Sequence, residues 1–251
     1  MDSRRDKPLL LMYAPNGTQM TTLWLSMWMA QDYTYLWNEQ GKCIVNNADG
    51  VAATRLLKDL MQWASPTSIT WDFPEGHAAF QLGKGALFPQ WNNLGGIYND
   101  TEDSLAAGNF SMGVWPKMKI HTSDTGHWFA LIAANCSNKE LAWTLIREYN
   151  SHTWQKKFFL HSDVNFNPSR ASVYADPEVQ EAFPWVGAIR ESNNLGRGQQ
   201  RQTLEWEEIN LVLQEELGLY VTKETDDVQQ VLDLIVTRVD EICVSSGRLK
   251  L

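Results

Sequence analysis

The chain has 251 residues, of which 43% are hydrophobic and 20% charged, so it is long enough to bury a core and its composition excludes a disordered or fibrous protein. Its 21 Lys and Arg against 30 Asp and Glu give a net charge of −9, which argues against a surface for nucleic acid or anionic membranes, because phosphates would be repelled. No apolar stretch reaches the roughly 18 residues of a membrane span, and the sequence as written carries no secretion signal.

Short apolar runs and amphipathic segments alternate in the first half of the chain. The apolar runs are typical of short buried strands, and the amphipathic segments of helices. Asp49 is the residue type that caps the second helix, and Gly83 is suited to end the third. In chain order, the predicted elements are a strand at 8–13, helices at 18–30, 50–63 and 74–83, and strands at 85–88, 112–116 and 128–134.

The remainder of the chain has almost only helical patterns. Ser137 and Glu140 have the spacing of a capping box, which predicts the start of a helix through Ile146. Further helices are predicted at 153–159, 178–183, 203–217 and 226–244. Strands alternating with helices, followed by helices alone, indicate an α/β protein finished by a helical layer.

Motifs for cofactor, metal or nucleophilic chemistry are missing from the sequence. Gly83-Lys84-Gly85 lacks the third glycine of a dinucleotide loop, and the five histidines form no HExxH pair. The three cysteines, Cys43, Cys136 and Cys243, are odd in number and far apart, so they predict buried small hydrophobic residues rather than a disulfide framework. We therefore expect no cofactor and no bound metal.

Tryptophan is unusually frequent, with 12 residues against 9 Phe and 7 Tyr, and indole is seldom fully buried. Three of the tryptophans stand where a predicted element meets a polar loop: Trp91, Trp128 and Trp206. Their neighbours carry amide, imidazole and carboxylate groups: Gln90, Asn92, Asn93, His127 and Glu205. An aromatic face beside such groups suits a sugar, whose C–H face packs on the ring while its hydroxyls form hydrogen bonds. The alternative is that these are core tryptophans.

An acid pair offers a second interpretation, a small carbohydrate-active hydrolase. Glu205 and Glu208 are three residues apart, so on a helix they share a face beside Trp206. Such a run of acids is more often a solvated surface. The hydrolase therefore stands as the alternative to a binding protein.

Six segments follow one another in a characteristic order. The first is Phe80-Gln81-Leu82-Gly83-Lys84-Gly85-Ala86-Leu87 followed by Trp91, and the second is the strand with proline at 112–116. The others are the crossing at 122–128, the helix start at 135–143, the Pro/Arg/Val-Tyr/Asp-Pro segment at 167–177, and the tryptophan-containing helix start at 205–209. Together they resemble the extracellular solute-binding proteins, family 1, of ABC importers, which are similar to maltose-binding protein.

The resemblance implies an α/β, periplasmic-binding-protein-like (type II) fold of two lobes that close on a ligand. Residues 8–123 and 168–251 would form the second lobe with its helical C-terminal layer, and residues 126–165 would belong to the first lobe. Family members are longer, so most of the first lobe is expected to be missing. The segment 126–165 would then expose apolar side chains such as Phe129, Leu131 and Ile132, a surface on which a missing lobe or a partner chain would dock.

The function implied is carbohydrate binding without turnover, as the substrate-binding component of an ABC importer. Expected partners are the sugar and the membrane permease, with no nucleic acid, and the expected location is periplasmic or extracellular. A third possibility is a structural or regulatory fragment that binds another protein through 126–165. The residues expected to bind the ligand are Asn16, Thr18, Gln90, Trp91, Asn92, His127, Trp128, Arg170 and Trp206.

Overall fold

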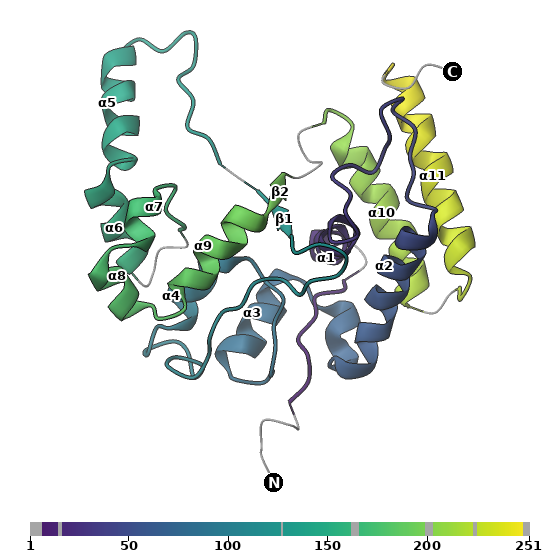
Figure 1. The fold of residues 1–251 in the computed structure, drawn as a ribbon, viewed down its shortest axis with the longest axis horizontal. Helices are drawn as coiled ribbons and strands as arrows, with labels where there is room; N and C mark the ends of the chain where they lie inside the picture. Colours follow the sequence, from purple (N-terminus) through teal and green to yellow (C-terminus); the bar gives the residue numbers. More distant parts are fainter. Residues whose placement is uncertain are drawn as a thin grey trace. The chain divides into compact units, whose positions relative to one another are not determined.

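The structure, a computed structural model, describes residues 7–14, 17–126, 128–161, 166–198, 203–222 and 225–247. The chain divides into two compact units. Unit 1 comprises Met1–Pro89, Trp115–Thr125 and Leu195–Leu251, and unit 2 comprises Gln90–Val114 and Gly126–Asn194. Figure 1 labels their helices and strands.

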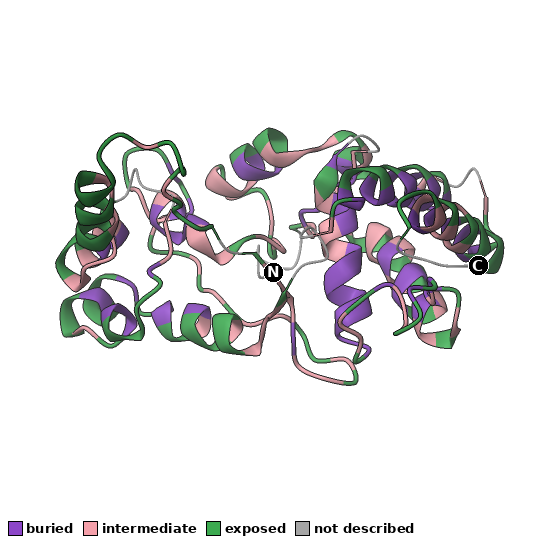
Figure 2. Ribbon diagram, turned by 90° about the horizontal axis from the view of Figure 1, so that it is seen from above, coloured by how far each residue is buried: buried purple, intermediate pink, exposed green. Residues whose placement is uncertain are grey.

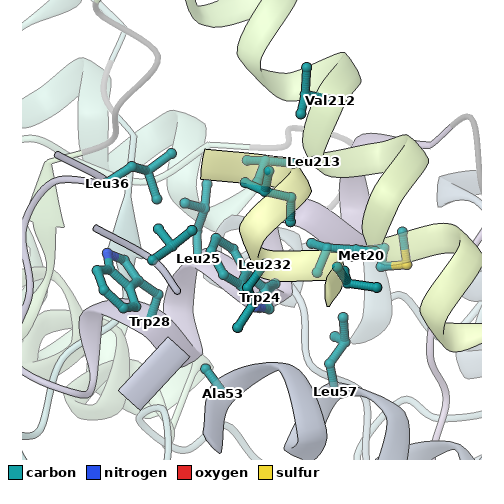
Figure 3. Packing of buried hydrophobic residues seen from close by; sticks show 14 of the residues in the cluster. Met20, Trp24, Leu25, Trp28, Leu36, Ala53, Leu57, Val212, Leu213 and Leu232 are labelled. Atoms are coloured by element: carbon teal, nitrogen blue, oxygen red, sulfur yellow. The ribbon is translucent and has the colours of Figure 1, made fainter. Parts of the chain in front are cut away.

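The core of unit 1 lies between helices from both ends of the sequence: α1 (Thr18–Met29), α2 (Ala48–Asp59), α10 (Trp206–Val221) and α11 (Val228–Ser245). α10 packs along α11, and α1 contacts both α2 and α10. Figure 3 shows Met20, Trp24 and Leu25 of α1 among apolar side chains of the other three helices. The helices predicted for these segments are confirmed, with ends that differ by a few residues.

α1 is buried on most of its surface because its sequence is apolar nearly all round. Its polar atoms are paired inside the core: Trp24 Nε1 donates to Thr54 Oγ1 at 2.9 Å, and Thr21 Oγ1 donates to Asn210 Oδ1 at 2.9 Å. These bonds tie α1 to α2 and α10. The apolar packing and the paired polar groups thus make the four helices one body.

α2 begins two residues before the predicted start, and Asp49 is not its cap. Asn47 Oδ1 accepts hydrogen bonds from the backbone N–H groups of Asp49 at 2.9 Å and Gly50 at 3.0 Å. Asp49 instead accepts from Tyr33 Oη and pairs with Lys119, which lowers the pKa of its carboxyl. The prediction of Asp49 as the cap was wrong because Asn and Asp cap helices about equally well. The sequence pattern therefore does not show whether Asn47 or Asp49 is the cap.

The predicted strands at 8–13 and 85–88 lie side by side but are too short to be assigned as strands. Leu9 forms parallel bridges to Ala64 and Leu87, and Leu10 N–H donates to Leu87 O at 2.9 Å. The strands assigned in the described ranges are β1 (Asp124–Thr125) and β2 (Arg197–Gly198), paired in parallel. β2 lies in the part of the chain for which the sequence predicts helices alone.

Between these segments, α2 continues into the 3-10 helix η1 (Leu60–Trp63), and a second 3-10 helix, η2 (Pro66–Thr70), precedes α3 (Phe73–Gln81). α3 confirms the helix predicted at 74–83. Glu75 Oε2 accepts from the backbone N–H of Asp72 at 3.0 Å, and Gly83 follows the helix with a φ of +63°, the left-handed conformation that favours glycine. Residues 112–116, predicted as a strand, have no regular structure.

Unit 2 is built from short helices around an aromatic cluster. In chain order they are η3 (Asn92–Leu94), α4 (Gly95–Tyr98), α5 (Lys139–Tyr149), α6 (His152–Leu160), α7 (Ala171–Tyr174), α8 (Pro177–Ala182) and α9 (Val186–Leu195). Phe183 stacks on Trp185 at 4.9 Å between ring centroids and meets Phe159 edge to face at 5.2 Å. The sequence predicts α5, α6 and α8 but not α4, α7 or α9.

The apolar run at 128–134 is not the buried strand that the sequence predicts. It has no regular structure, and Trp128, Phe129 and Leu131 are exposed. α5 follows it, capped by Asn138, whose Oδ1 accepts from Leu141 N–H at 2.9 Å, and not by Ser137 as predicted. No residue of α5 is buried (Figure 2). A strand needs neighbours, and the described residues offer this run no sheet to join.

The break between the two units at Thr125–Gly126 falls where the resemblance places a lobe boundary. Residues 90–114, however, belong to the same compact unit as 128–161. Phe110 and Met112 explain this grouping, because they pack against the cluster that contains Phe159 and Trp185. Which lobe each segment occupies stays a prediction.

Candidate functional site

Side-chain amides gather in unit 2 around the start of η3. Asn92 Oδ1 accepts a hydrogen bond from Asn167 Nδ2 at 2.6 Å, and Asn92 Nδ2 donates to Asn193 Oδ1 at 3.1 Å. Asn193 Nδ2 in turn donates to Tyr174 Oη at 3.3 Å. We call Asn92, Asn167, Asn193 and Tyr174 the amide cluster.

Elements far apart in sequence supply these side chains. Asn92 begins η3, Tyr174 ends α7, and Asn193 lies in α9. Tyr174 Oη donates to Pro168 O at 2.7 Å, which ties α7 to the loop that carries Asn167. Burial raises the pKa of Tyr174 to about 12, so its hydroxyl stays a hydrogen-bond donor at neutral pH.

One acceptor in the amide cluster is unused. Asn167 donates to Asn92 through its amide nitrogen. Its amide oxygen, Oδ1, is buried and has no hydrogen-bond partner in the described part of the chain. A buried acceptor left unpaired costs about 1–3 kcal/mol. A ligand hydroxyl that donates to this oxygen would recover that free energy.

Trp91 adjoins the amide cluster and is 38% exposed. Its backbone N–H donates to Gln90 Oε1 at 2.7 Å, so the Gln90 side chain holds the backbone of Trp91. Four residues on, a Cβ added at Gly95 would lie 2.2 Å from the Trp185 ring, so only glycine allows η3 and α4 to pack this closely against that ring. A partly exposed indole therefore stands next in sequence to Asn92 of the amide cluster, and the binding of a ligand by Trp91 and Asn92 stays a prediction.

Arg170, also predicted, belongs to a second polar group. Gln155 Nε2 donates to Ser169 Oγ at 2.8 Å and to Asn150 Oδ1 at 3.2 Å, and Gln155 Oε1 accepts from the backbone N–H groups of Ser169 and Arg170. Arg170 Nε donates to Asn150 O at the end of α5. The guanidinium is thus engaged in holding α5 and α6 to the loop before α7, although it is exposed.

Trp206 does not face solvent. It is the first residue of α10, its residue surface is only 4% exposed, and it packs in the core cluster of unit 1. The sequence leaves open whether Trp206 is a core tryptophan, and this packing favours that interpretation. A ligand contact would require the indole to leave the core.

The other predicted residues are scattered. Thr18 is the exposed first residue of α1, and its carbonyl accepts from Thr22 Oγ1 at 2.9 Å. Trp128 is fully exposed within the unstructured run before α5. Asn16 and His127 lie outside the described residues. Of the predicted set, the amide cluster contains Asn92, and Gln90 and Trp91 precede it directly in the sequence.

The acid pair of the hydrolase interpretation does not share one environment. Glu205 is buried at the N-terminal end of α10, whereas Glu208, one turn on, is exposed. In the hydrolase interpretation, a buried carboxylate and an exposed one would therefore have to act together.

Unit 2 also has a hollow of about 320 Å³ lined by Thr153, Lys156, Lys157, Leu160, His161 and Glu178. Lys156 Nζ lies 2.8 Å from Asp176 Oδ1 and 2.7 Å from Glu178 Oε2. Hydrogen bonding to these two carboxylates raises the pKa of Lys156 and lowers that of Asp176. The charges compensate each other, and none of the predicted ligand-binding residues lines this hollow.

Two functional groups of the amide cluster were missed by the sequence reading, Asn193 and Tyr174. Asn193 lies on α9, a helix that the sequence does not predict, and Tyr174, although part of the segment at 167–177, is 19 residues from Asn193. Asn167 lies in the same segment, where nothing local marks it as a partner of Asn92. Only a tertiary contact joins these residues to Asn92.

No cluster of three or more His, Cys, Asp or Glu side chains suited to a metal ion is found in the ranges that the structure describes. Over the same ranges, no helix has the length and apolar character needed to cross a membrane.

An accessible indole beside linked amides is the make-up of a surface that binds a polar small molecule. This chain belongs to the family of bacterial extracellular solute-binding proteins, whose sequence pattern it matches over residues 4–156. A "Probable ABC transporter-binding protein" of Deinococcus radiodurans is 26% identical over 152 residues, which cover 59% of this chain and 36% of that protein.

Solved structures of similar fold agree with this family. Maltose-bound MalE3 of T. maritima has a TM-score of 0.80 and 19% identity, and the match covers 96% of this chain and 62% of that one. A solute-binding protein of an Agrobacterium radiobacter K84 ABC transporter, in complex with ribitol, has a TM-score of 0.78 and 20% identity. That match covers 96% of this chain and 61% of the other. The fold is therefore of the periplasmic-binding-protein type, as predicted, and the chain spans about three fifths of the length of these structures.

Proposed function

We propose that this chain is part of the substrate-binding component of an ABC importer, and that it binds a carbohydrate or related polyol without converting it. Trp91 beside the amide cluster is the observation that carries the proposal. The indole offers a flat apolar face to the C–H groups of the ligand. The amides beside it offer donors and acceptors to the hydroxyls.

The unpaired Asn167 Oδ1 supports a hydroxylated ligand in particular. Hydrogen bonds from Asn167 to Asn92, from Asn92 to Asn193 and from Asn193 to Tyr174 order the cluster before ligand arrives, so it loses little conformational entropy on binding. Asn167 Oδ1 is an acceptor that needs a donor. A sugar hydroxyl supplies a donor, whereas a carboxylate or phosphate ligand would bring a second acceptor to the same oxygen.

The similar proteins support the same class of ligand. One of the solved structures is described with maltose bound and the other with ribitol, and both ligands are rich in hydroxyl groups. Transport itself would need a membrane permease as partner, and the family's description as extracellular supports a location in the periplasm or outside the cell. Six further residues remain predicted ligand contacts that the amide cluster does not support: Asn16, Thr18, His127, Trp128, Arg170 and Trp206.

Isothermal titration of the 251-residue chain with maltose and with ribitol tests the proposal. We expect saturable binding of at least one, and recovery of the ligand unchanged after long incubation. Trp91→Ala should weaken binding by about 1–3 kcal/mol, the loss typical of an aromatic anchor. Trp63→Ala is the matched control, because Trp63 is an exposed tryptophan of unit 1 and should leave the affinity unchanged.

Two results would contradict the proposal. The first is the absence of saturable heat with every sugar and polyol of a broad panel from a folded chain. The second is release of reducing sugar that Glu205→Gln abolishes, which would establish the hydrolase instead.

A further inference from the structure

Two of the three cysteines, Cys43 and Cys243, belong to the buried core cluster of unit 1. Cys43 is 2% exposed and Cys243 is fully buried, and both are free thiols in the structure. They are far apart in the sequence, so only tertiary packing brings them into one cluster. Cys136, the remaining cysteine, is partly exposed and belongs to unit 2.

A hydrogen bond holds the segment that carries Cys43 on α11. The backbone N–H of Cys43 donates to Asp240 Oδ1 at 2.7 Å, and a bridge to Trp37 fixes the backbone on the other side of Cys43. Asp240 precedes Cys243 by three residues in α11. Residues at this spacing are neighbours on one helix face. Cys243 therefore lies on the face of α11 to which the Cys43 segment is bonded.

The ionisation of the Cys43 thiol agrees with this proximity. Its pKa is raised to about 12, chiefly by burial and also by the negative charges of Asp240 and of an ionised Cys243. An effect of one thiol on the other requires a short distance between them, because electrostatic interactions weaken with separation. The thiolate is the reactive form of cysteine, and the folded chain holds almost none of it at neutral pH. The pair is therefore inert once the core has closed.

We infer that Cys43 and Cys243 form a disulfide when the chain folds in an oxidising environment, with a disulfide of low molecular weight as the oxidant. One cysteine thiolate attacks the oxidant, which releases one thiolate and leaves a mixed disulfide. The other cysteine thiolate then attacks the protein sulfur of this mixed disulfide and releases the second thiolate. The oxidant thus takes up two electrons, and its two thiolates take up the two protons that the cysteines lose.

Burial and location determine when this bond forms. The family's description as extracellular supports an environment in which disulfides form and persist. Because the closed core suppresses the thiolate, exchange takes place while the chain folds, before the Cys43 segment packs on α11. The bond closes a loop of about 200 residues, and the stability gained from a disulfide is expected to grow with the length of the loop. The inference does not depend on whether the chain binds a sugar.

Refolding under defined redox conditions tests the inference. The 251-residue chain is unfolded with a reductant, refolded in a mixture of oxidised and reduced glutathione, and alkylated with iodoacetamide in denaturant. Peptide mapping without reductant should find the peptide of Cys43 linked to that of Cys243, with Cys136 alkylated or carrying glutathione. A chain that is folded under reductant before it meets the same glutathione mixture should form the bond at least about tenfold more slowly.

Thermal unfolding measures the effect of the bond. The linked chain should unfold about 10 °C above the same chain kept reduced. Cys136→Ser is the matched control and should keep both the linkage and this difference, whereas Cys243→Ala should lose both.

Three results would overturn the inference. The first is a refolded chain in which all three cysteines are alkylated or carry glutathione. The second is a linkage that includes Cys136. The third is a linked chain that unfolds below the reduced one, because the bond would then distort the native packing of Cys43 on α11.

Discussion

His77 is a residue whose ionisation opposes folding. It lies in α3 with its ring 3.9 Å from that of Phe73 and 6.2 Å from that of Phe88, measured between centroids, and burial lowers its pKa from 6.5 to about 4. Between these values the unfolded chain binds the proton and the folded chain does not. The stability that neutral His77 contributes is therefore complete above pH 6.5 and is lost as the pH falls toward 4.

The corresponding variant is His77→Phe, which keeps an aromatic ring but cannot be protonated. Between pH 7 and pH 4.5, the free energy of unfolding of the wild type should fall by about 2 kcal/mol more than that of the variant, since each pKa unit corresponds to about 1.4 kcal/mol. Urea unfolding at both pH values measures this difference. Equal losses in the two proteins would show that His77 is protonated in the folded state.

The sequence singles out Trp91 and Asn92 by their residue types and adjacency. In the structure the Trp91 side chain is partly exposed, and Asn92 is bonded to Asn193. The same reasoning chose Trp206, which the core of unit 1 buries. A position at the end of a helix, next to a polar loop, does not show whether the side chain faces the core or the solvent. Asn193 had no local signal, because its partner is about a hundred residues away.

Helix caps allow a prediction at the scale of the element. Asn47→Ala should lower the free energy of unfolding by about 1 kcal/mol, because Asn47 caps α2 and α2 packs against α1, α10 and α11. Asn138→Ala removes the same kind of cap from α5, which buries no residue. It should speed hydrogen exchange in α5 with little change in global stability. Equal changes in urea-unfolding stability would contradict this difference.

Two glycines in helices should respond to alanine in opposite directions. A Cβ at Gly50 would lie 1.7 Å from Val45 O, a backbone atom that cannot yield without moving the chain, so Gly50→Ala should destabilise by about 3 kcal/mol. Gly187 in α9 has nothing within 4 Å of its added Cβ, so Gly187→Ala should stabilise by about 0.5–1 kcal/mol. Thermal unfolding of both variants measures these changes, and a tolerated Gly50→Ala would contradict the packing of α2 against residue 45.

Helices were predictable where the apolar pattern is long and turn residues bound it, as in α3, which Gly83 follows. Strands were not, because the apolar runs at 8–13 and 128–134 require a neighbour before they become strands. The first run finds Leu87 across a parallel bridge, and the second finds no sheet in the described chain. Sequence pattern predicts the tendency, and the partner determines whether the strand forms.

For the whole molecule, the order of motifs along the chain was sufficient to identify the family and its fold, since these depend on many weak signals in register. The division into compact units was not predictable in the same way. The aromatic packing of Phe110 against Trp185 draws residues 90–114 into unit 2, and such packing depends on which parts of the fold are present.

The most direct test of the account asks whether sugar reaches Trp91. Protein labelled with ¹⁵N in its 12 tryptophan indoles is titrated with maltose and with ribitol, and the Trp91 signal is assigned by its loss in Trp91→Phe. We predict a saturable shift of that signal, with no shift of Trp24, whose Nε1 is bonded to Thr54 inside the core. Saturable shifts at other indoles with none at Trp91 would contradict the account.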